Sequence, residues 1–207
     1  MKLEFYFDPS CPFCWVTSRW LLSVSNKRDL HITWRPFSLA MKNDELKADN
    51  SGKQGHLSAH RVIRVMLAAA KDGVSLSDMY TKFGIRHFMV GDEYDDQFIA
   101  DVLKELKLDP QYAKSADDTK LDNELEASIA EATKVVGQDI GVPTIVFEFE
   151  DGHKTGFFGP VLQALPDEET SLELWDGLIK LAAVPGFYEL KRGREAGGPD
   201  VFSTARC

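Results

Sequence analysis

Hydrophobic alternation at the start of the chain predicts a buried strand. Residues 2–7 carry leucine and two phenylalanines at alternate positions, and Asp8-Pro9-Ser10 interrupts the pattern. Apolar residues then recur at helical spacing over 12–26, a segment that begins with proline, which suits the first position of a helix. Residues 31–39 predict a second strand. A strand, a helix and a strand in this order favour parallel pairing of the strands through a right-handed crossover.

Helical spacing dominates the middle of the chain, and strand signals return near its end. After a polar segment at 41–56, expected to be a loop, helices are predicted at 62–69, 76–83, 98–106, a short one from 110, and 121–137. A strand at 143–149, a turn at Asp151-Gly152, a strand at 155–158, a helix at 168–182 and a tail follow. This order predicts an α/β, thioredoxin-like fold with an inserted all-helical subdomain. The expected bounds are 1–54 and 116–185 for the thioredoxin-like domain, 55–115 for the insertion, and 186–207 for the C-terminal tail.

Composition and charge narrow the class of protein. Of 207 residues, 43% are hydrophobic and 28% are charged, as in ordinary globular proteins. The net charge of −9 disfavours nucleic acid as a partner, because phosphate binding needs a basic surface. No run approaches the ~18 apolar residues of a membrane-spanning helix, and no signal peptide is visible. We therefore expect a cytoplasmic protein that does not act at a membrane.

Two of the three cysteines form the strongest chemical motif. An odd, low count does not make a disulfide framework, and Cys207, the last residue, is expected to be an exposed tail thiol. Cys11 and Cys14 lie where a strand ends and a helix begins. A helix N-terminus lowers the pKa of a thiol, so Cys11 is predicted to attack, and Cys14, one turn later, to resolve the mixed disulfide. This predicts a thiol–disulfide oxidoreductase.

Residues beside the cysteines are candidates for the wall of the site. Pro12 stiffens the turn, and Phe13 offers an apolar contact to substrate or shields the cysteines. Asp8 tunes or orients the site, or simply ends the strand. Trp15 either borders the cleft or packs inside the helix.

A proline near the last strands is a second candidate. In a thioredoxin-like fold, the proline that begins this strand is cis and places the preceding backbone where a peptide or thiol can pair with it. Val142, Pro143 and Thr144 are therefore candidate substrate-binding residues. Proline is also tolerated at a strand start for ordinary reasons, so the signal gains weight only beside the cysteine motif.

The alternative interpretation of the C-x-x-C motif is that it supplies two of the four ligands of a zinc site. His56 and His60 have the i, i+4 spacing of a ligand pair, so a Cys2His2 site is formally possible. The position of the cysteines between a strand and a helix, with proline between them, favours the redox interpretation and no metal. For the two histidines we expect a solvated or interdomain helix face, with a place in the substrate cleft as the alternative.

Several segments together resemble one family. The matching stretches are Phe7 to Trp15, Thr17 to Trp20, Gly137 to Ile145, Phe157 to Leu162, Leu174 to Asp176 and Phe187 to Arg192. They resemble the actinobacterial DsbA-like proteins called mycothiol-dependent nitroreductases, over nearly the whole chain. The resemblance implies a cytoplasmic homodimer without a tightly bound cofactor, in which mycothiol supplies electrons and forms a mixed disulfide on Cys11. It also implies disulfide or nitro-aromatic substrates.

One position departs from the family pattern. The known member of this family carries tryptophan where this chain carries Phe13. A change between the two cysteines shifts the redox potential. Periplasmic DsbA proteins usually carry histidine there, which stabilises the thiolate; Phe13 cannot, so a strong oxidant is disfavoured.

Two other function classes remain open from the sequence. DsbA-like isomerases of the hydroxychromene carboxylate type and kappa-type transferases activate a thiol cofactor and typically lack the second cysteine, so Cys14 favours redox chemistry. A peptide-binding chaperone module would keep its function after both cysteines are replaced.

Overall fold

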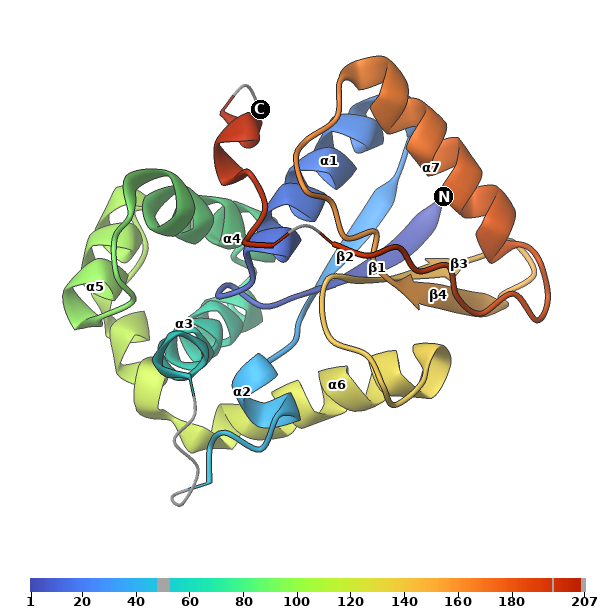
Figure 1. Ribbon diagram of the computed structural model, residues 1–207. Helices are drawn as coiled ribbons and strands as arrows, with labels where there is room; N and C mark the ends of the chain where they lie inside the picture. The colour runs from blue at the N-terminus through green and yellow to red at the C-terminus, as the bar shows by residue number, and fades with distance from the viewer. Residues whose placement is uncertain (48–52, 195, 206–207) are drawn as a thin grey trace. The chain divides into compact units, whose positions relative to one another are not determined.

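The computed structural model describes residues 1–47, 53–194 and 196–205; the expectation for Cys207 lies outside this range. Figure 1 shows the elements. In chain order they are β1 (Lys2–Phe7), α1 (Pro12–Arg28), β2 (His31–Pro36), α2 (Leu39–Lys42), α3 (Gln54–Lys71), α4 (Leu76–Gly84), the π-helix η1 (Ile85–Val90), α5 (Asp96–Glu105), the 3-10 helices η2 (Pro110–Asp117) and η3 (Thr119–Leu121), α6 (Asp122–Val136), β3 (Thr144–Glu148), β4 (Lys154–Phe158), α7 (Glu168–Ala182) and the 3-10 helix η4 (Val201–Thr204).

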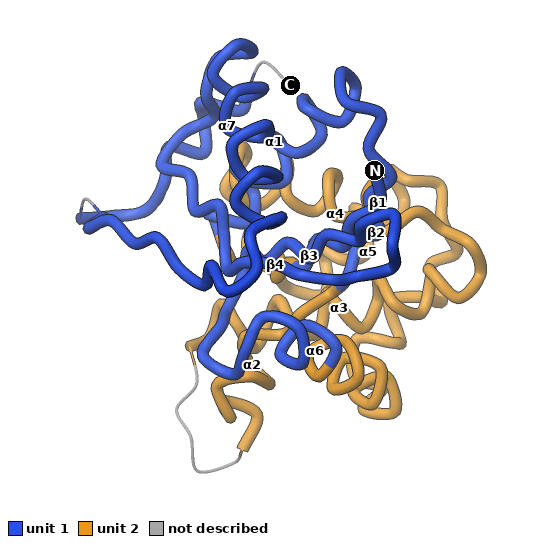
Figure 2. The backbone as a smooth tube through the Cα atoms, turned by 90° about the vertical axis from the view of Figure 1, so that its right-hand side faces the viewer, with its two compact units in different colours: residues 1–6, 12–35, 131–207 blue, residues 7–11, 36–130 orange. Residues whose placement is uncertain are grey.

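Two compact units divide the chain, as Figure 2 shows. Unit 1 comprises residues 1–6, 12–35 and 131–207, and unit 2 comprises residues 7–11 and 36–130. Unit 2 therefore contains the helices from α2 to the first part of α6, together with the short segment that ends at Cys11. The narrower inserted domain expected at 55–115 stays a prediction.

Unit 1 is built on a sheet with strand order β2-β1-β3-β4. β1 pairs antiparallel with β3, Phe5 opposite Ile145, and β3 pairs antiparallel with β4. The start of β2 bonds to the start of the chain, where His31 N–H donates to Met1 O at 2.9 Å, and beyond its end Phe37 N–H donates to Phe7 O at 2.8 Å. The two strands therefore start at the same edge and run in the same direction, which confirms the parallel pairing expected for β1 and β2.

Aromatic side chains join α1 and α7 to the sheet of unit 1. Val16, Trp20 and Val24, the predicted apolar stripe of α1, are all fully buried. The rings of Trp20 and Trp175 lie 6.1 Å apart, and Trp175 in turn lies 5.9 Å from Phe147 of β3. Figure 1 shows α1 and α7 side by side over the sheet. Burial of such large rings removes much apolar surface from water and so supplies a large share of the stability of this unit.

Unit 2 buries the apolar faces of its helices against each other. Ile63 and Leu67 of α3 pack with Leu121 and Leu125 at the start of α6. A second, aromatic group links Phe83 of α4 to α5, and Phe7 to Tyr80. None of the helices in the described ranges is both long and apolar enough to cross a membrane.

The second strand is shorter than its sequence pattern indicates. The expected strand at 31–39 ends at Pro36, because Ser38 begins a helix instead of continuing the strand. Ser38 Oγ accepts a hydrogen bond from Met41 N–H at 3.2 Å, which is a helix cap. The loop expected at 41–56 was also too long, since α2 occupies its start and α3 its end. Part of that loop, 48–52, lies outside the described residues.

Candidate active site

Cys11 and Cys14 lie at the start of α1, as predicted. Cys11 is the residue before Pro12, the first helical position, and 9% of its surface is exposed. Cys14 is fully buried, and both residues stand as thiols rather than as a disulfide. A reagent from solvent therefore reaches Cys11 in preference to Cys14, and unpaired N–H groups of a helix start favour negative charge at this position.

A buried carboxylate organises the turn that leads to Cys11. Asp8 is fully buried; its Oδ1 accepts from Ser10 N–H at 2.8 Å and from Ser10 Oγ at 2.6 Å. Its Oδ2 accepts from Leu39 N–H, the first residue of α2, at 2.6 Å, and its carbonyl accepts from Cys11 N–H at 3.0 Å. Burial raises the pKa of Asp8, and these hydrogen bonds oppose the rise. Asp8 therefore holds the turn from inside and does not line its surface.

Two residues that the sequence did not single out also reach this turn. Tyr94 is buried and donates a hydrogen bond from its hydroxyl to Pro9 O at 2.9 Å. His87 of η1 stacks on Tyr94, with ring centroids 4.0 Å apart and an angle of 22° between the rings. Both belong to unit 2, as does the Asp8–Cys11 turn. No local sequence signal marks them, because a π-helix has no recognisable hydrophobic period.

The C-terminal segment covers residues next to the cysteines on α1. The guanidinium of Arg194 lies 5.5 Å from the centre of the partly exposed Phe13 ring. Trp15 is buried and donates from Nε1 to Thr204 Oγ1 at 3.0 Å. Trp15 is therefore packed against the C-terminal segment, and its place at the wall of the cleft stays a prediction. The expected tail is structured at its end as η4, which Asp200 caps by accepting from Ser203 N–H at 3.2 Å.

The peptide bond between Val142 and Pro143 is cis, as expected. Pro143 directly precedes β3, and its carbonyl accepts from Gly159 N–H at 2.8 Å. Thr144 is fully buried and donates from Oγ1 to Gly141 O at 2.8 Å, so its side chain closes the turn before the strand. The thiol-binding role of this segment stays a prediction.

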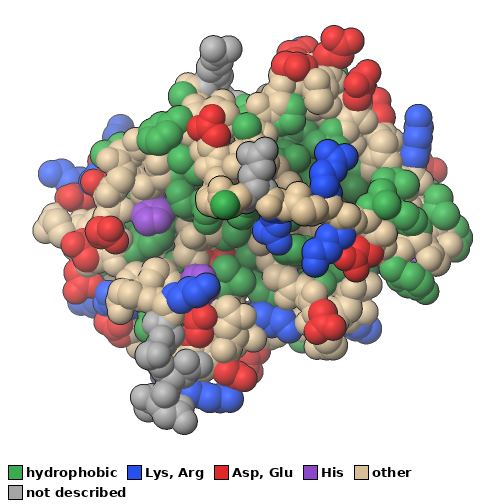
Figure 3. Space-filling view, viewed as in Figure 1, with side chains coloured by type: hydrophobic (Ala, Val, Ile, Leu, Met, Phe, Trp, Pro, Cys, Tyr) green, Lys and Arg blue, Asp and Glu red, His purple; other side chains and the backbone are tan. Residues whose placement is uncertain are grey.

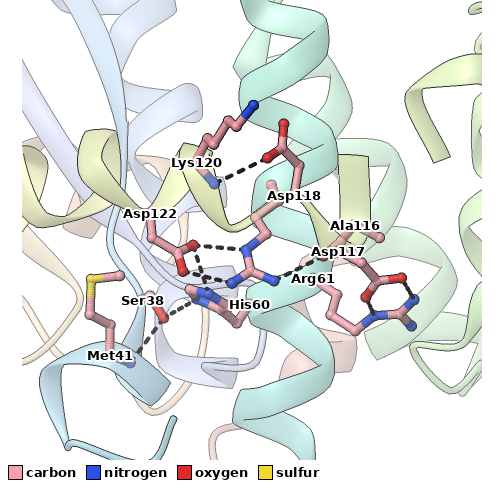
Figure 4. A network of polar contacts seen from close by, with 10 residues as sticks. Ser38, Met41, His60, Arg61, Ala116, Asp117, Asp118, Lys120 and Asp122 are labelled. Carbon is pink, nitrogen blue, oxygen red and sulfur yellow. Dashed lines mark hydrogen bonds and ion pairs between the residues drawn. The ribbon is translucent and has the colours of Figure 1, made fainter. Parts of the chain in front are cut away.

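Of the expected solvated or interdomain face for the two histidines of α3, the structure contradicts the solvated alternative, and the interdomain alternative stays a prediction. His60 is 2% exposed: its Nδ1 meets Ser38 Oγ at 2.8 Å and its Nε2 meets Asp122 Oδ1 at 3.1 Å. Figure 4 shows Ser38, His60 and Asp122 pointing toward one another. His56 is also largely covered and bonds to Glu45 at 2.8 Å. Helical spacing alone could not reveal this, because the partners lie 11 to 62 residues away.

The network around His60 is saturated and lies out of reach of a substrate. Asp122 accepts from Arg64 Nε at 2.8 Å and Nη2 at 2.7 Å, and an ionised carboxylate can only accept, so His60 donates to it from Nε2. Ser38 then donates to Nδ1. Burial and the charge of Arg64 lower the pKa of His60, which keeps the ring neutral. A nucleophilic serine needs exposure, and Ser38 is fully buried and caps α2, so the trio is structural.

Among the described residues, no group of three or more His, Cys, Asp or Glu side chains is arranged to hold a metal ion. His56 and His60 are each bonded to a carboxylate of unit 2. The two histidines are thus engaged in other contacts than those a Cys2His2 site would need.

Comparison with known proteins places residues 10–192 within one family model, described as Rv2466c-like, mycothiol-dependent nitroreductase Rv2466c. A relative from Mycobacterium tuberculosis, the uncharacterized protein Rv2286c, is 28% identical over 204 residues. The match covers 97% of this chain and 86% of that protein.

Solved structures share the fold at low sequence identity. The cytosolic disulfide reductase DsbM from Pseudomonas aeruginosa, also solved with GSH, superposes with a TM-score of 0.61 at 16% identity, covering 88% of this chain and 100% of DsbM. A probable DsbA oxidoreductase, SCO1869 from Streptomyces coelicolor, has a TM-score of 0.56 at 18% identity and covers 97% of both chains. The thioredoxin-like, DsbA-like fold predicted from the sequence is thereby confirmed.

Proposed function

The chain belongs to the Rv2466c-like family, and on that premise we propose that it is a thiol–disulfide reductase whose Cys11–Cys14 dithiol is regenerated by mycothiol. Membership makes the protein an oxidoreductase related to mycothiol-dependent enzymes. The identity of the reacting pair, the thiol and the cellular compartment are our proposals.

The observation that carries the proposal is the unequal exposure of the two cysteines. Cys11, 9% exposed before the first turn of α1, is the thiol that a substrate disulfide can reach. Cys14 is fully buried in the first turn of α1, and this burial supports the proposal that it attacks only what is already bound to Cys11. This division into attacking and resolving thiols is what a reversible two-electron exchange requires.

The proposed cycle consists of two thiol–disulfide exchanges that reduce the substrate and two that reduce the enzyme again. The Cys11 thiolate attacks a substrate disulfide, one half leaves as a thiolate, and the other half stays on Cys11. Cys14 loses its proton and attacks Cys11 Sγ, so the second half leaves and the Cys11–Cys14 disulfide forms. The substrate has gained two electrons. Two molecules of the small thiol then return two electrons to the enzyme and leave as their own disulfide.

Two features of unit 1 are proposed to bind the substrate. Val142, before the cis proline, is the backbone position proposed to pair with an extended thiol ligand. Pro143 and Thr144 are proposed to flank this position, and the carbonyl of Pro143 already accepts one hydrogen bond from Gly159 N–H. Phe13, with Arg194 over its ring, is proposed as an apolar wall next to the cysteines.

Intact-mass spectrometry of trapped adducts tests the proposal. Every protein in this test carries Cys207→Ser, because a tail thiol expected to be exposed would itself form adducts. Reduced wild type and Cys14→Ser are then exposed in parallel to oxidised mycothiol and to oxidised glutathione. We expect Cys14→Ser to gain the mass of one mycothiol and to retain it, because the resolving thiol is absent. Wild type should instead lose two hydrogens and carry no adduct.

The matched control is Cys11→Ser, which should remain unmodified by either disulfide. An adduct from glutathione alone would reject mycothiol as the thiol but keep the dithiol chemistry. Adducts that persist in Cys11→Ser would reject the assignment of Cys11 as the attacking residue.

The cellular setting is proposed from the resemblance and the surface. We propose a cytoplasmic homodimer that acts on disulfide or nitro-aromatic compounds. Figure 3 shows hydrophobic side chains gathered on the side of β4 and the segment after α7. Val184, Tyr188 and Leu190 are 52%, 86% and 76% exposed there. Sedimentation of wild type against Tyr188→Asp tests whether this aromatic tail is the dimer contact; an unchanged dimer in the variant would rule the contact out.

A further inference from the structure

One threonine joins the helix of the cysteines to the loop that follows β4. Thr17 lies in α1, one turn after Cys14, and is fully buried. Its Oγ1 donates a hydrogen bond to the carbonyl oxygen of Pro160 at 2.8 Å. A hydroxyl side chain within a helix commonly donates to a carbonyl of the preceding turn. Three other hydroxyls of α1 do so, each to the carbonyl three residues earlier: Ser18, Ser23 and Ser25. Thr17 instead bonds to a partner outside the helix.

The residue before Pro160 continues this connection to the start of β3. Gly159 N–H donates a hydrogen bond to the carbonyl of Pro143 at 2.8 Å, and Pro143 directly precedes β3. Gly159 has a φ of 118°, a backbone conformation that residues with a side chain rarely adopt. A Cβ atom at this position would also lie 3.3 Å from the backbone nitrogen of Val161. Glycine is therefore needed at the point where the loop meets Pro143.

Two hydrogen bonds from adjacent residues thus tie the start of β3 to the first turns of α1. Pro160 accepts from Thr17, and Gly159 donates to Pro143. All four residues belong to unit 1. Because Cys14 and Thr17 are three residues apart on one helix, they are neighbours on its surface. The turn before β3 is therefore held to the part of α1 that carries the dithiol, through contacts that do not use the sulfur atoms.

We propose that Thr17 is a positioning residue, which together with Gly159 sets where the backbone of Val142 stands relative to Cys11. The inference rests on the proposed function and deepens it, because it names the contacts that hold the ligand-pairing segment in place. An extended disulfide has to pair with Val142 and present its sulfur to Cys11 Sγ at the same time. A misplacement of about 1 Å between two such groups can cost on the order of 10²-fold in rate. A small disulfide without a backbone to pair meets Cys11 alone.

Two substitutions release the turn at different points. Thr17→Val keeps the shape of the side chain but removes the donor, so the carbonyl of Pro160 has to find another partner and the loop is free to shift. Gly159→Ala keeps the N–H group but forces a side chain into the left-handed region of φ, which moves the same loop. Neither change touches a cysteine. A merely structural role for Thr17 would affect the reaction with every disulfide alike.

The test compares extended disulfides with a small one on the same variants. Every protein carries Cys207→Ser, so that the tail thiol takes no part. Reduced wild type, Thr17→Val and Gly159→Ala are mixed with oxidised mycothiol, with oxidised glutathione or with bis(2-hydroxyethyl) disulfide, and the loss of two hydrogens per chain is followed by intact mass. We expect both variants to react at least ~5-fold more slowly than wild type with the extended disulfides that oxidise wild type, and within about twofold of wild type with the small one.

Ser23→Ala is the matched control, because Ser23 lies on the same helix and donates over the same 2.8 Å, but to Trp20 within α1. It should match wild type with every disulfide.

Three results would overturn the assignment. They are equal slowing of Thr17→Val with all disulfides, unchanged rates of Thr17→Val with all of them, and a folded Gly159→Ala that reacts as wild type does. If Gly159→Ala does not fold, Thr17→Val decides the question by itself. A wild type that none of the disulfides oxidises would instead reject the underlying dithiol function.

Discussion

Two polar regions of unit 2 place a histidine in opposite chemical situations. Around His60, both ring nitrogens are bonded, and the ring lies between a helix cap and an ion pair. Around His87, only Nδ1 is bonded and the ring is partly exposed. His60 carries its proton on Nε2, and His87 carries it on Nδ1. The buried, fully bonded ring of His60 stabilises the fold, whereas the ring of His87 makes one hydrogen bond and is partly exposed.

The largest expected effect separates the reactive region from the structural one. Replacing Cys11 with serine should abolish disulfide reduction, because a serine hydroxyl is not ionised near neutral pH. The free energy of unfolding should change by less than about 1 kcal/mol, as the two side chains are nearly the same size. Activity is measured by substrate reduction and stability by urea unfolding. Residual turnover well above background would place the chemistry elsewhere.

Breaking the hydrogen-bond network around His60 should lower the stability of the fold and leave the activity unchanged. Asp122→Ala leaves Arg64 and His60 without their shared carboxylate, and loss of one partner of a buried pair costs about 3 kcal/mol. Urea unfolding measures this loss. The rate of disulfide reduction per folded molecule should stay within twofold of wild type. A stable variant with impaired reduction would give the network a catalytic role and erase the contrast with His87.

A smaller effect is expected from the hydrogen bond that joins Tyr94 to the Cys11 turn. Tyr94→Phe leaves the buried carbonyl of Pro9 without this donor and should destabilise the fold by about 1 kcal/mol. Tyr112→Phe is the matched control, because that hydroxyl donates to Asp72 at an exposed position and its loss should be near zero. Equal destabilisation by the two variants would mean that the bond to Pro9 has no special weight.

The protonation of His60 should contribute to the pH dependence of the free energy of unfolding. Burial lowers its folded pKa below the ordinary 6.5, aided by the charge of Arg64. Above pH 6.5 the ring is neutral in both the folded and the unfolded protein, so the free energy of unfolding no longer depends on the protonation of His60. Below pH 6.5 the unfolded ring takes up a proton before the folded ring does. The free energy of unfolding therefore decreases as the pH is lowered, by at most about 1.4 kcal/mol per pH unit.

Urea unfolding of wild type and His60→Gln at pH 7.5, 6.5 and 5.5 measures this slope. The variant should show a shallower decrease between pH 6.5 and 5.5, even though it is less stable throughout. Parallel curves for the two proteins would mean that His60 is not held neutral in the folded state.

Local signals explain which predictions the structure confirmed. The start of α1 at Pro12 and the span of α7 follow from nearby residues, a proline and a helical period, whereas the cis bond at Pro143 was expected from the thioredoxin-like fold. The end of β2 was misjudged because the cap at Ser38 competes with strand extension, and alternation of apolar residues does not register such caps.

Long-range contacts explain what the sequence could not supply. The burial of His60 depends on Asp122, 62 residues away, and Tyr94 reaches Pro9 across 85 residues. The contact of Trp15 with Thr204 spans 189 residues. None of these separations leaves a periodic trace, so the histidine spacing on α3 suggested a solvated or interdomain face and did not reveal the partners on other elements.

The sequence by itself determined the order of strands and helices, the position of Cys11 and Cys14 at a helix start, and the class of chemistry. These depend on hydrophobic period, proline and spacing, which act over a few residues. Only the tertiary structure decided the difference in exposure between the two cysteines, the saturation of His60 and the orientation of His87. Exposure and tautomer depend on which groups meet in space, and that is settled by packing between segments distant in the chain.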